Sequence, residues 1–192
     1  MPGLADLVSR LVPGAQHLSV PFAALLLVHV PAGLTSVVTG GVAAASQKRP
    51  GRHPRFGTIY FWALAVVFIS ASGMAALRWT EDRHLFVLGA ISFGVASVGY
   101  AARRVRWDGW KSFHALGMGV SYVVLLTAFY VDNGPHLPLW DRLPAIAYWT
   151  LPALVGIPLL VRGLRRHTRF SRDLRAAALA LSRSSRSRVD TA

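Results

Sequence analysis

Long apolar stretches alternate with short charged segments along the whole chain. A helix needs about 20 apolar residues to cross the ~30 Å hydrocarbon layer of a bilayer. The period-two alternation of a membrane-spanning strand barrel is not seen. The pattern therefore predicts an all-α integral membrane protein with five transmembrane helices, the first four of them forming a bundle. The predicted spans cover about residues 20–46, 57–77, 84–102, 112–131 and 144–161.

The segments between these spans differ in charge, and this predicts an orientation. Basic residues are concentrated after spans one, three and five, whereas the other two connections, at 78–83 and 131–142, also carry acidic residues. Because Lys and Arg are enriched in cytoplasmic loops, we expect the C-terminus in the cytoplasm and the N-terminus outside. This divides the chain into an N-terminal interfacial segment (1–17), a transmembrane domain (18–162) and a basic cytoplasmic tail (163–192), partly disordered.

Composition supports a membrane location. Of the 192 residues, 53% are hydrophobic and only 15% are charged, yet the net charge is +13. Clustering of this charge at the ends of apolar spans favours anionic lipid headgroups over nucleic acid as the partner. The chain contains no cysteine, which excludes thiolate metal ligands and iron–sulfur clusters. The expected headgroup contacts are Arg49, Arg52, Arg55, Arg103 and Arg104.

Two histidines follow basic loops at the start of apolar spans. His53 lies in "KRPGRHPRFGTIYF" and His114 in "WKSFHALGMGVSY". Two spans, one crossing and one return, separate them, so both are expected at similar depth on the cytoplasmic side, and an internal duplication is suggested. Their imidazoles could bind one metal ion or haem iron. They could instead assist an anionic or quinone-like ligand together with Arg52 and Arg55, or simply occupy the headgroup layer.

Other histidines suggest further sites. His29 lies inside the first span, where an ionisable group is costly and is a functional candidate by default. Its structural alternative is a neutral imidazole bonded to a Ser, a Thr or a carbonyl freed by Pro31. An alternative outer metal site would combine His84, His136, Asp82 and Asp132, although loop residues of these types are usually hydrated.

These motifs also carry a resemblance. "HVPAG" in span one, "HPRFGTIYFWAL" in span two and "FHALGMGVSYVVLLTAFYVDNG" in span four resemble a family of bacterial predicted membrane proteins of unknown function. The family has a His-x-x-x-Gly-x-x-Tyr motif at the start of its second helix, and its later motif more usually reads His-Arg than His-Ala. The resemblance implies a helical bundle and marks His29, His53, Gly57, Tyr60, His114 and Tyr122.

A looser similarity is to membrane cytochromes b, which hold haem between histidines of neighbouring helices. Many of them carry two histidines thirteen or fourteen residues apart on one helix, and no predicted span here has that pair. This disfavours a two-haem wire and leaves a single haem near the cytoplasmic face.

These observations lead to one functional expectation and its alternatives. We expect a multi-pass protein of a bacterial inner membrane that binds haem b or a metal through His53 and His114 and takes part in electron transfer. His29 would be a second ligand site, a proton-handling group or a quinone contact, and Tyr60 and Tyr122 would border the cofactor. The alternative is a non-catalytic carrier for a lipid or other hydrophobic molecule, or an accessory subunit in a homo-oligomer or membrane complex. No catalytic triad, phosphate loop or zinc-protease motif is present, so no catalytic residue is assigned.

Overall fold

The computed structural model describes residues 19–47, 51–138, 140 and 142–165, which are largely helical and contain no strand. Five of the helices are long and apolar enough to cross a membrane, which confirms the prediction of a multi-pass helical membrane protein. The predicted N-terminal segment 1–17, Arg49 and the tail from 166 onward lie outside the described residues. The elements are α2 (Val20–Ala45), α3 (Arg52–Leu77), α4 (Trp79–Val105), α5 (Trp110–Asn133), the 3-10 turn η2 (Gly134–His136) and a final helix, Ala145–Arg165.

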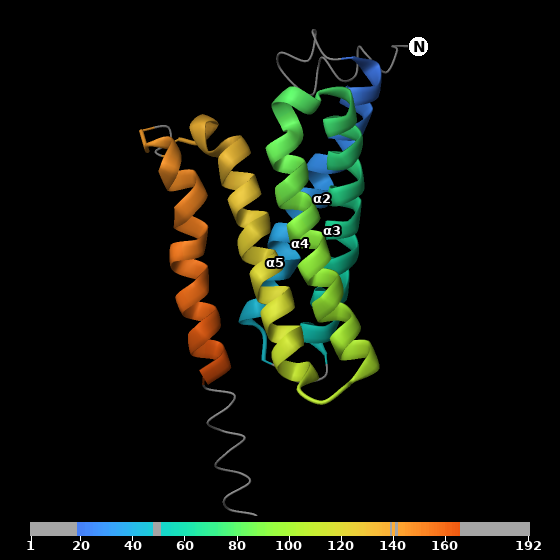
Figure 1. Ribbon diagram of the computed structural model, residues 1–192, viewed down its shortest axis with the longest axis vertical. Coiled ribbons are helices and arrows are strands. Elements are labelled where there is room, and N and C mark those ends of the chain that lie inside the picture. Colours follow the sequence, from blue (N-terminus) through green and yellow to red (C-terminus); the bar gives the residue numbers. More distant parts are fainter. Residues whose placement is uncertain (1–18, 48–50, 139, 141, 166–192) are drawn as a thin grey trace, which may run out of the picture.

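The first four helices form an antiparallel bundle, as predicted, and the final helix runs beside α5 (Figure 1). The most extensive contacts join α2 to α3 and α4 to α5, and α3 also packs on α4. The fold is therefore two helical hairpins laid against each other. Leu160 of the final helix meets Gly119 of α5.

Four of the helices extend beyond the apolar runs that predicted them. α3 begins at Arg52, so His53 lies in its first turn and not in the preceding loop. Pro54 is tolerated there because the first amides of a helix have no partner within it. α4 begins at Trp79, which leaves Arg78 as the only residue between α3 and α4. Glu81 and Asp82 in the first turn of α4 are favoured by the helix dipole.

The two hairpin loops and the last turn of the final helix lie at the same end of the bundle (Figure 1). We call this the basic end, because it carries most of the described arginines and lysines. Glycine permits the backbone to enter two of its helices from a left-handed conformation, with φ of 120° at Gly51 and 78° at Gly109. The basic residues there are Arg52, Arg55, Arg103, Arg104, Arg106, Lys111, Arg162 and Arg165.

The bundle core combines aromatic rings with very small residues. Tyr60, Leu64 and Ala96 are almost completely buried. Phe61, Phe93 and Phe68 stack in a row between α3 and α4, with neighbouring centroids 5.7 and 5.4 Å apart. Apolar side chains also cover the outside of the bundle, as expected for a surface that faces lipid.

Candidate functional site: a histidine pair at the basic end

His53 and His114 meet across the diagonal of the bundle. Their ring centroids are 6.2 Å apart and their planes are nearly perpendicular, at 84°. His53 belongs to the first turn of α3 and His114 to the second turn of α5. Both side chains are half-buried. The two histidines therefore lie at the same level of the bundle, and their depth in a membrane stays a prediction.

Each imidazole is oriented by the helix that precedes its own. Nδ1 of His53 donates to the carbonyl oxygen of Ala43 on α2, at 2.8 Å. Nδ1 of His114 donates to the carbonyl oxygen of Gly99 on α4, at 3.0 Å. Because a carbonyl can only accept, Nδ1 must carry the proton in both rings. In the neutral imidazole the lone pair then belongs to Nε2, the nitrogen on the far side of the ring.

This bonding pattern is typical of histidines that bind a metal. Metal-binding histidines almost always donate their second ring N–H to a carbonyl, carboxylate or water, which fixes the tautomer and the ring direction. With metal–nitrogen distances of about 2.0–2.1 Å, two imidazoles on opposite sides of one ion would have centroids roughly 6 Å apart. The observed centroid separation of 6.2 Å is close to this spacing, and the two rings meet in a T-shaped arrangement.

The protein supplies two ligands at this place and not a full set. Among the described residues, no three or more histidine, aspartate or glutamate side chains are grouped so that they could hold a metal ion. A structural zinc ion takes four protein ligands, whereas haem iron brings four ring nitrogens of its own and takes one or two from the protein. The pair therefore fits haem iron better than an isolated ion.

Tyr60 and Tyr122 lie two turns deeper than the histidines on the same helices. Their ring centroids are 5.9 Å apart, and Tyr60 is only 2% exposed. Tyr60 Oη lies 2.8 Å from Ser121 Oγ, and since Ser121 itself donates to the carbonyl of Met118, the tyrosine is the donor. Tyr122 donates to the carbonyl of Val37 at 2.9 Å. Both hydroxyls are therefore hydrogen-bonded to neighbouring helices, and the two tyrosines lie directly below the histidine pair in the bundle.

Each tyrosine also connects the two hairpins. Tyr60 of α3 reaches Ser121 of α5, and Tyr122 of α5 reaches Val37 of α2. Sequence analysis did not identify Ser121 or Ser92, which is 1% exposed and donates to the Ser121 carbonyl at 2.9 Å. The available signal was a small polar residue within an apolar run, which in membranes often marks a helix contact.

His29 is separate from this pair. It precedes Ala43 by fourteen residues on α2, about 21 Å at 1.5 Å per residue. Its Nδ1 lies 3.0 Å from Ser70 Oγ on α3, and the Ser70 hydroxyl donates to the carbonyls of Val66 and Val67. The imidazole is therefore the donor to Ser70. This confirms the serine-bonded arrangement that the sequence offered as its structural alternative.

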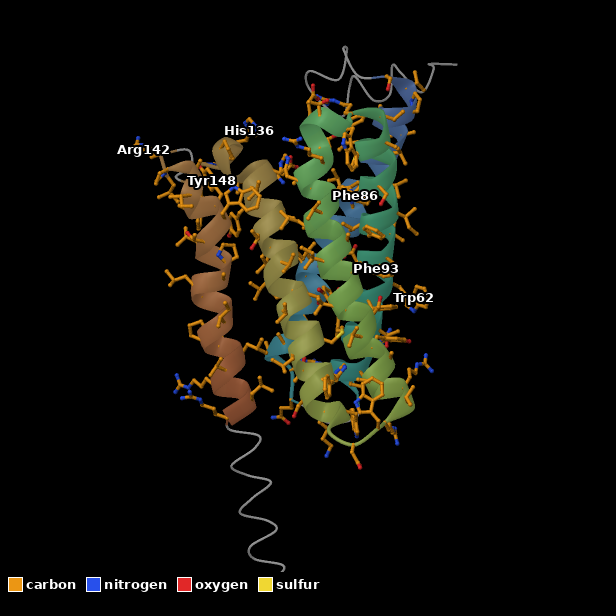
Figure 2. The ribbon with its side chains drawn as sticks, in the orientation of Figure 1. Trp62, Phe86, Phe93, His136, Arg142 and Tyr148 are labelled. Carbon is orange, nitrogen blue, oxygen red and sulfur yellow. The ribbon has the colours of Figure 1, made fainter. Side chains whose placement is uncertain are left out.

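The four residues of the outer site lie toward the end opposite the basic end. His84, in the second turn of α4, lies beside the ring of Trp149, with centroids 6.3 Å apart, and His136 lies in η2 (Figure 2). The described residues form no cluster of three or more potential ligands, so Asp82 and Asp132 do not complete a site with them here. One oxygen of Asp82 is buried without a hydrogen-bond partner. The outer metal site stays a prediction.

Comparison with protein families, curated proteins and solved structures finds nothing that matches this chain. The family resemblance therefore remains an expectation. The function is argued from the geometry of the histidine pair.

Proposed function

We propose that His53 and His114 would hold one haem b and that the protein carries electrons in a bacterial inner membrane. The observation that supports this most directly is the pair itself: two imidazoles 6.2 Å apart, each donating from Nδ1 to a backbone carbonyl. A haem held by two histidines would supply a one-electron redox couple, which favours electron transfer over oxygen chemistry.

The charge of the basic end supports the same proposal. Haem propionates are anionic, and Arg52, Arg55 and Lys111 belong to the first turns of the two helices that carry the histidines. Neither helix has a side-chain N-cap, since its N-cap residue is glycine. Uncapped amides and basic side chains together favour a nearby negative group.

The proposal places the basic end in the cytoplasm, because Lys and Arg accumulate in cytoplasmic loops. The cysteine-free sequence makes this easy to measure. In intact cells, an impermeant maleimide should label Pro135→Cys, whereas Asp108→Cys should react only after the membrane is opened. The reverse pattern would place the histidine pair on the other face.

The haem proposal is tested by absorption spectroscopy of the full chain, expressed with ample haem precursor and purified in mild detergent. We expect one haem per chain, with sharp α- and β-bands after reduction by dithionite. His53→Ala and His114→Ala should each abolish the six-coordinate spectrum. His136→Ala is the matched control and should retain it, because His136 lies at the opposite end. Haem-free protein, or spectra unchanged in both test variants, would overturn the proposal.

A further inference from the structure

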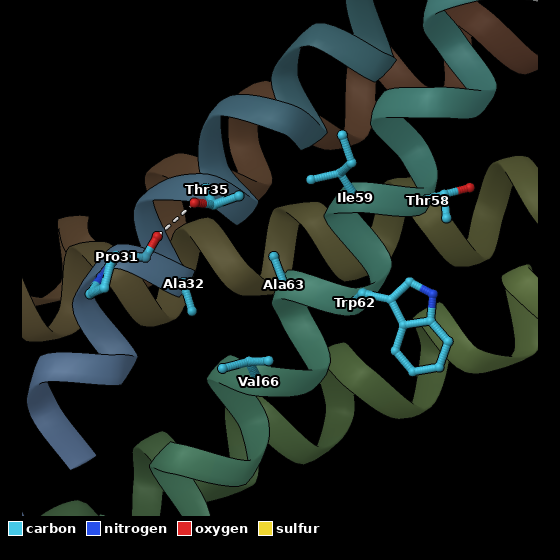
Figure 3. A pocket seen from close by; sticks show the side chains of 8 residues that line it. All are labelled: Pro31, Ala32, Thr35, Thr58, Ile59, Trp62, Ala63 and Val66. Carbon is cyan, nitrogen blue, oxygen red and sulfur yellow. Dashed lines mark hydrogen bonds between the residues drawn. The ribbon is translucent and has the colours of Figure 1, made fainter. Parts of the chain in front are cut away.

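A groove opens between α2 and α3 on the outer surface of the bundle (Figure 3). Its volume is about 500 Å³, within the range of roughly 300–1,000 Å³ that is usual for small-molecule sites. Pro31, Ala32 and Thr35 line it from α2, and Ile59, Trp62 and Ala63 line it from α3. The indole of Trp62 is 60% exposed and stands at its edge.

The groove offers an occupant almost no polar partner. The hydroxyl of Thr35 donates to the carbonyl of Pro31 at 2.8 Å, along its own helix (Figure 3). The hydroxyl of Thr58, the other polar side chain of the lining, donates to the carbonyl of Pro54 at 2.9 Å. Both threonine hydroxyls are therefore already used, and apart from the indole N–H of Trp62 the remaining side chains of the lining are apolar. A hydrocarbon chain satisfies such a surface, whereas a polar headgroup does not.

A continuous exposed stripe on α3 leads from this groove to the basic end. Arg52, Arg55, Ile59, Trp62 and Val66 follow one another at intervals of three and four residues, and all are exposed. Arg55 therefore lies about 6 Å along the axis from Ile59. Neither Arg52 nor Arg55 forms an ion pair with any residue that the structure describes. Two cationic side chains thus lie one to two turns from the groove, on the same face.

The other hairpin lacks this combination. There the backbones of α4 and α5 touch at Gly99 and Gly117. Arg104 also donates to the hydroxyl of Tyr100 at 2.8 Å, with its guanidinium over the same ring. The α2–α3 hairpin thus combines an apolar groove with two arginines that form no ion pair within the described part of the chain.

We propose that this groove is a binding site for an anionic phospholipid. One acyl chain lies in the groove against Trp62 and Ala63, and the headgroup phosphate is held by Arg52 and Arg55. The site lies on the lipid-facing side of the hairpin and uses neither histidine, but it shares Arg52 and Arg55 with the basic rim assigned to the haem propionates.

The test is tryptophan quenching by brominated lipids in vesicles that contain the full-length protein. Two samples have the same composition, a minority of phosphatidylglycerol in phosphatidylcholine, and differ only in which lipid carries the bromine. The difference between wild type and Trp62→Phe isolates the emission of Trp62. We expect phosphatidylglycerol to quench Trp62 well above its mole fraction, and its relative affinity to fall about fivefold for each arginine replaced in Arg52→Gln and Arg55→Gln.

The matched control replaces Arg103 and Arg104 with glutamine, which removes the same charge from the same end but beside the closed hairpin. It should leave the quenching of Trp62 unchanged. Ala63→Leu fills the groove and should reduce quenching by phosphatidylglycerol while an unchanged melting temperature reports an intact fold. Quenching in proportion to mole fraction, or an equal loss in the Arg103/Arg104 control, would show that only bulk lipid covers the groove and would overturn the proposal.

Discussion

The α2–α3 and α4–α5 hairpins use the same plan at the basic end and different contacts below it. In each, a histidine near the start of the second helix donates to a carbonyl of the first helix. In each, a tyrosine two turns deeper crosses to the other hairpin. The parallel agrees with the internal duplication suggested by the sequence, and it places the two imidazoles face to edge.

Below the histidines the two hairpins pack about equally extensively but through different local contacts. α4 and α5 touch at Gly99 and Gly117, where no side chain separates them. α2 and α3 are held by a polar contact, His29 to Ser70, and leave the groove between that contact and the basic end. The comparison teaches that one histidine arrangement can be supported by a tight hairpin or by an open one that admits lipid.

The largest effect should come from separating the tight hairpin. A Cβ added at Gly117 would lie 2.7 Å from Gly99 Cα and 2.8 Å from the carbonyl oxygen of Val95, which are backbone atoms that cannot move aside cheaply. Gly117→Ala should therefore destabilise the protein by about 1–3 kcal/mol, measured by unfolding in mixed detergent micelles. Gly57→Ala is the matched control in α3, where nothing lies within 4 Å, and it should change stability by less than about 0.5 kcal/mol. Equal costs would show that the hairpins are closed alike.

An intermediate effect should come from the polar contact of the open hairpin. Ser70→Ala removes the hydroxyl acceptor from the buried imidazole of His29, although the carbonyl of Val67 also faces that ring. We expect a cost of about 1 kcal/mol in the same unfolding measurement. His29→Leu removes the donor as well, so adding Ser70→Ala to it should cost clearly less than Ser70→Ala alone. Strict additivity in this double-mutant cycle would show that the contact does not join the helices.

The smallest effect should come from the two tyrosine hydroxyls, which hold the hairpins together. Hydrogen bonds between membrane helices contribute about 0.6 kcal/mol on average, so Tyr60→Phe and Tyr122→Phe should each cost about that much. The two costs should be similar, because each hydroxyl makes one bond to the other hairpin. A loss of stability in Tyr60→Phe but not in Tyr122→Phe would show that the two hydroxyls do not join the hairpins equally. Thr35→Val, on the lipid-facing side, is the control and should change little.

The five crossings were predictable because each needs about twenty apolar residues, and nothing else in the sequence imitates such a run. The helix ends were less predictable. His53 lies in the first turn of α3 and Glu81 in the first turn of α4, outside the apolar stretches that indicated these helices. Counting crossings predicted that His53 and His114 lie at similar depth on the same side. The contact between their rings could not be predicted, because it depends on which helices face each other across the bundle.

The groove and the tight contact were not predictable, for a reason specific to membranes. Lipid-facing and core-facing residues are both apolar in this protein, so the sequence does not distinguish them. Ala63 lines the groove and Ala96 is fully buried in the core, yet both are alanines within apolar runs. Gly57 and Gly117 follow their histidines at nearly the same interval, yet only Gly117 touches another backbone. Which glycine is a contact is decided by the tertiary structure.

The connection between α3 and α4 has a consequence for how the chain enters the membrane. A single residue, Arg78, joins the two helices, and it forms an ion pair with Glu81 in the next turn. With the basic end in the cytoplasm, this turn is what must be translocated when α3 and α4 insert. Because the link is so short, α3 and α4 can insert together as a pair. The ion pair offsets one positive charge of the link that would otherwise oppose its translocation. His53 and His114, at the other end of the bundle, would then be brought together only after α5 has been inserted, so the site would assemble late in membrane insertion.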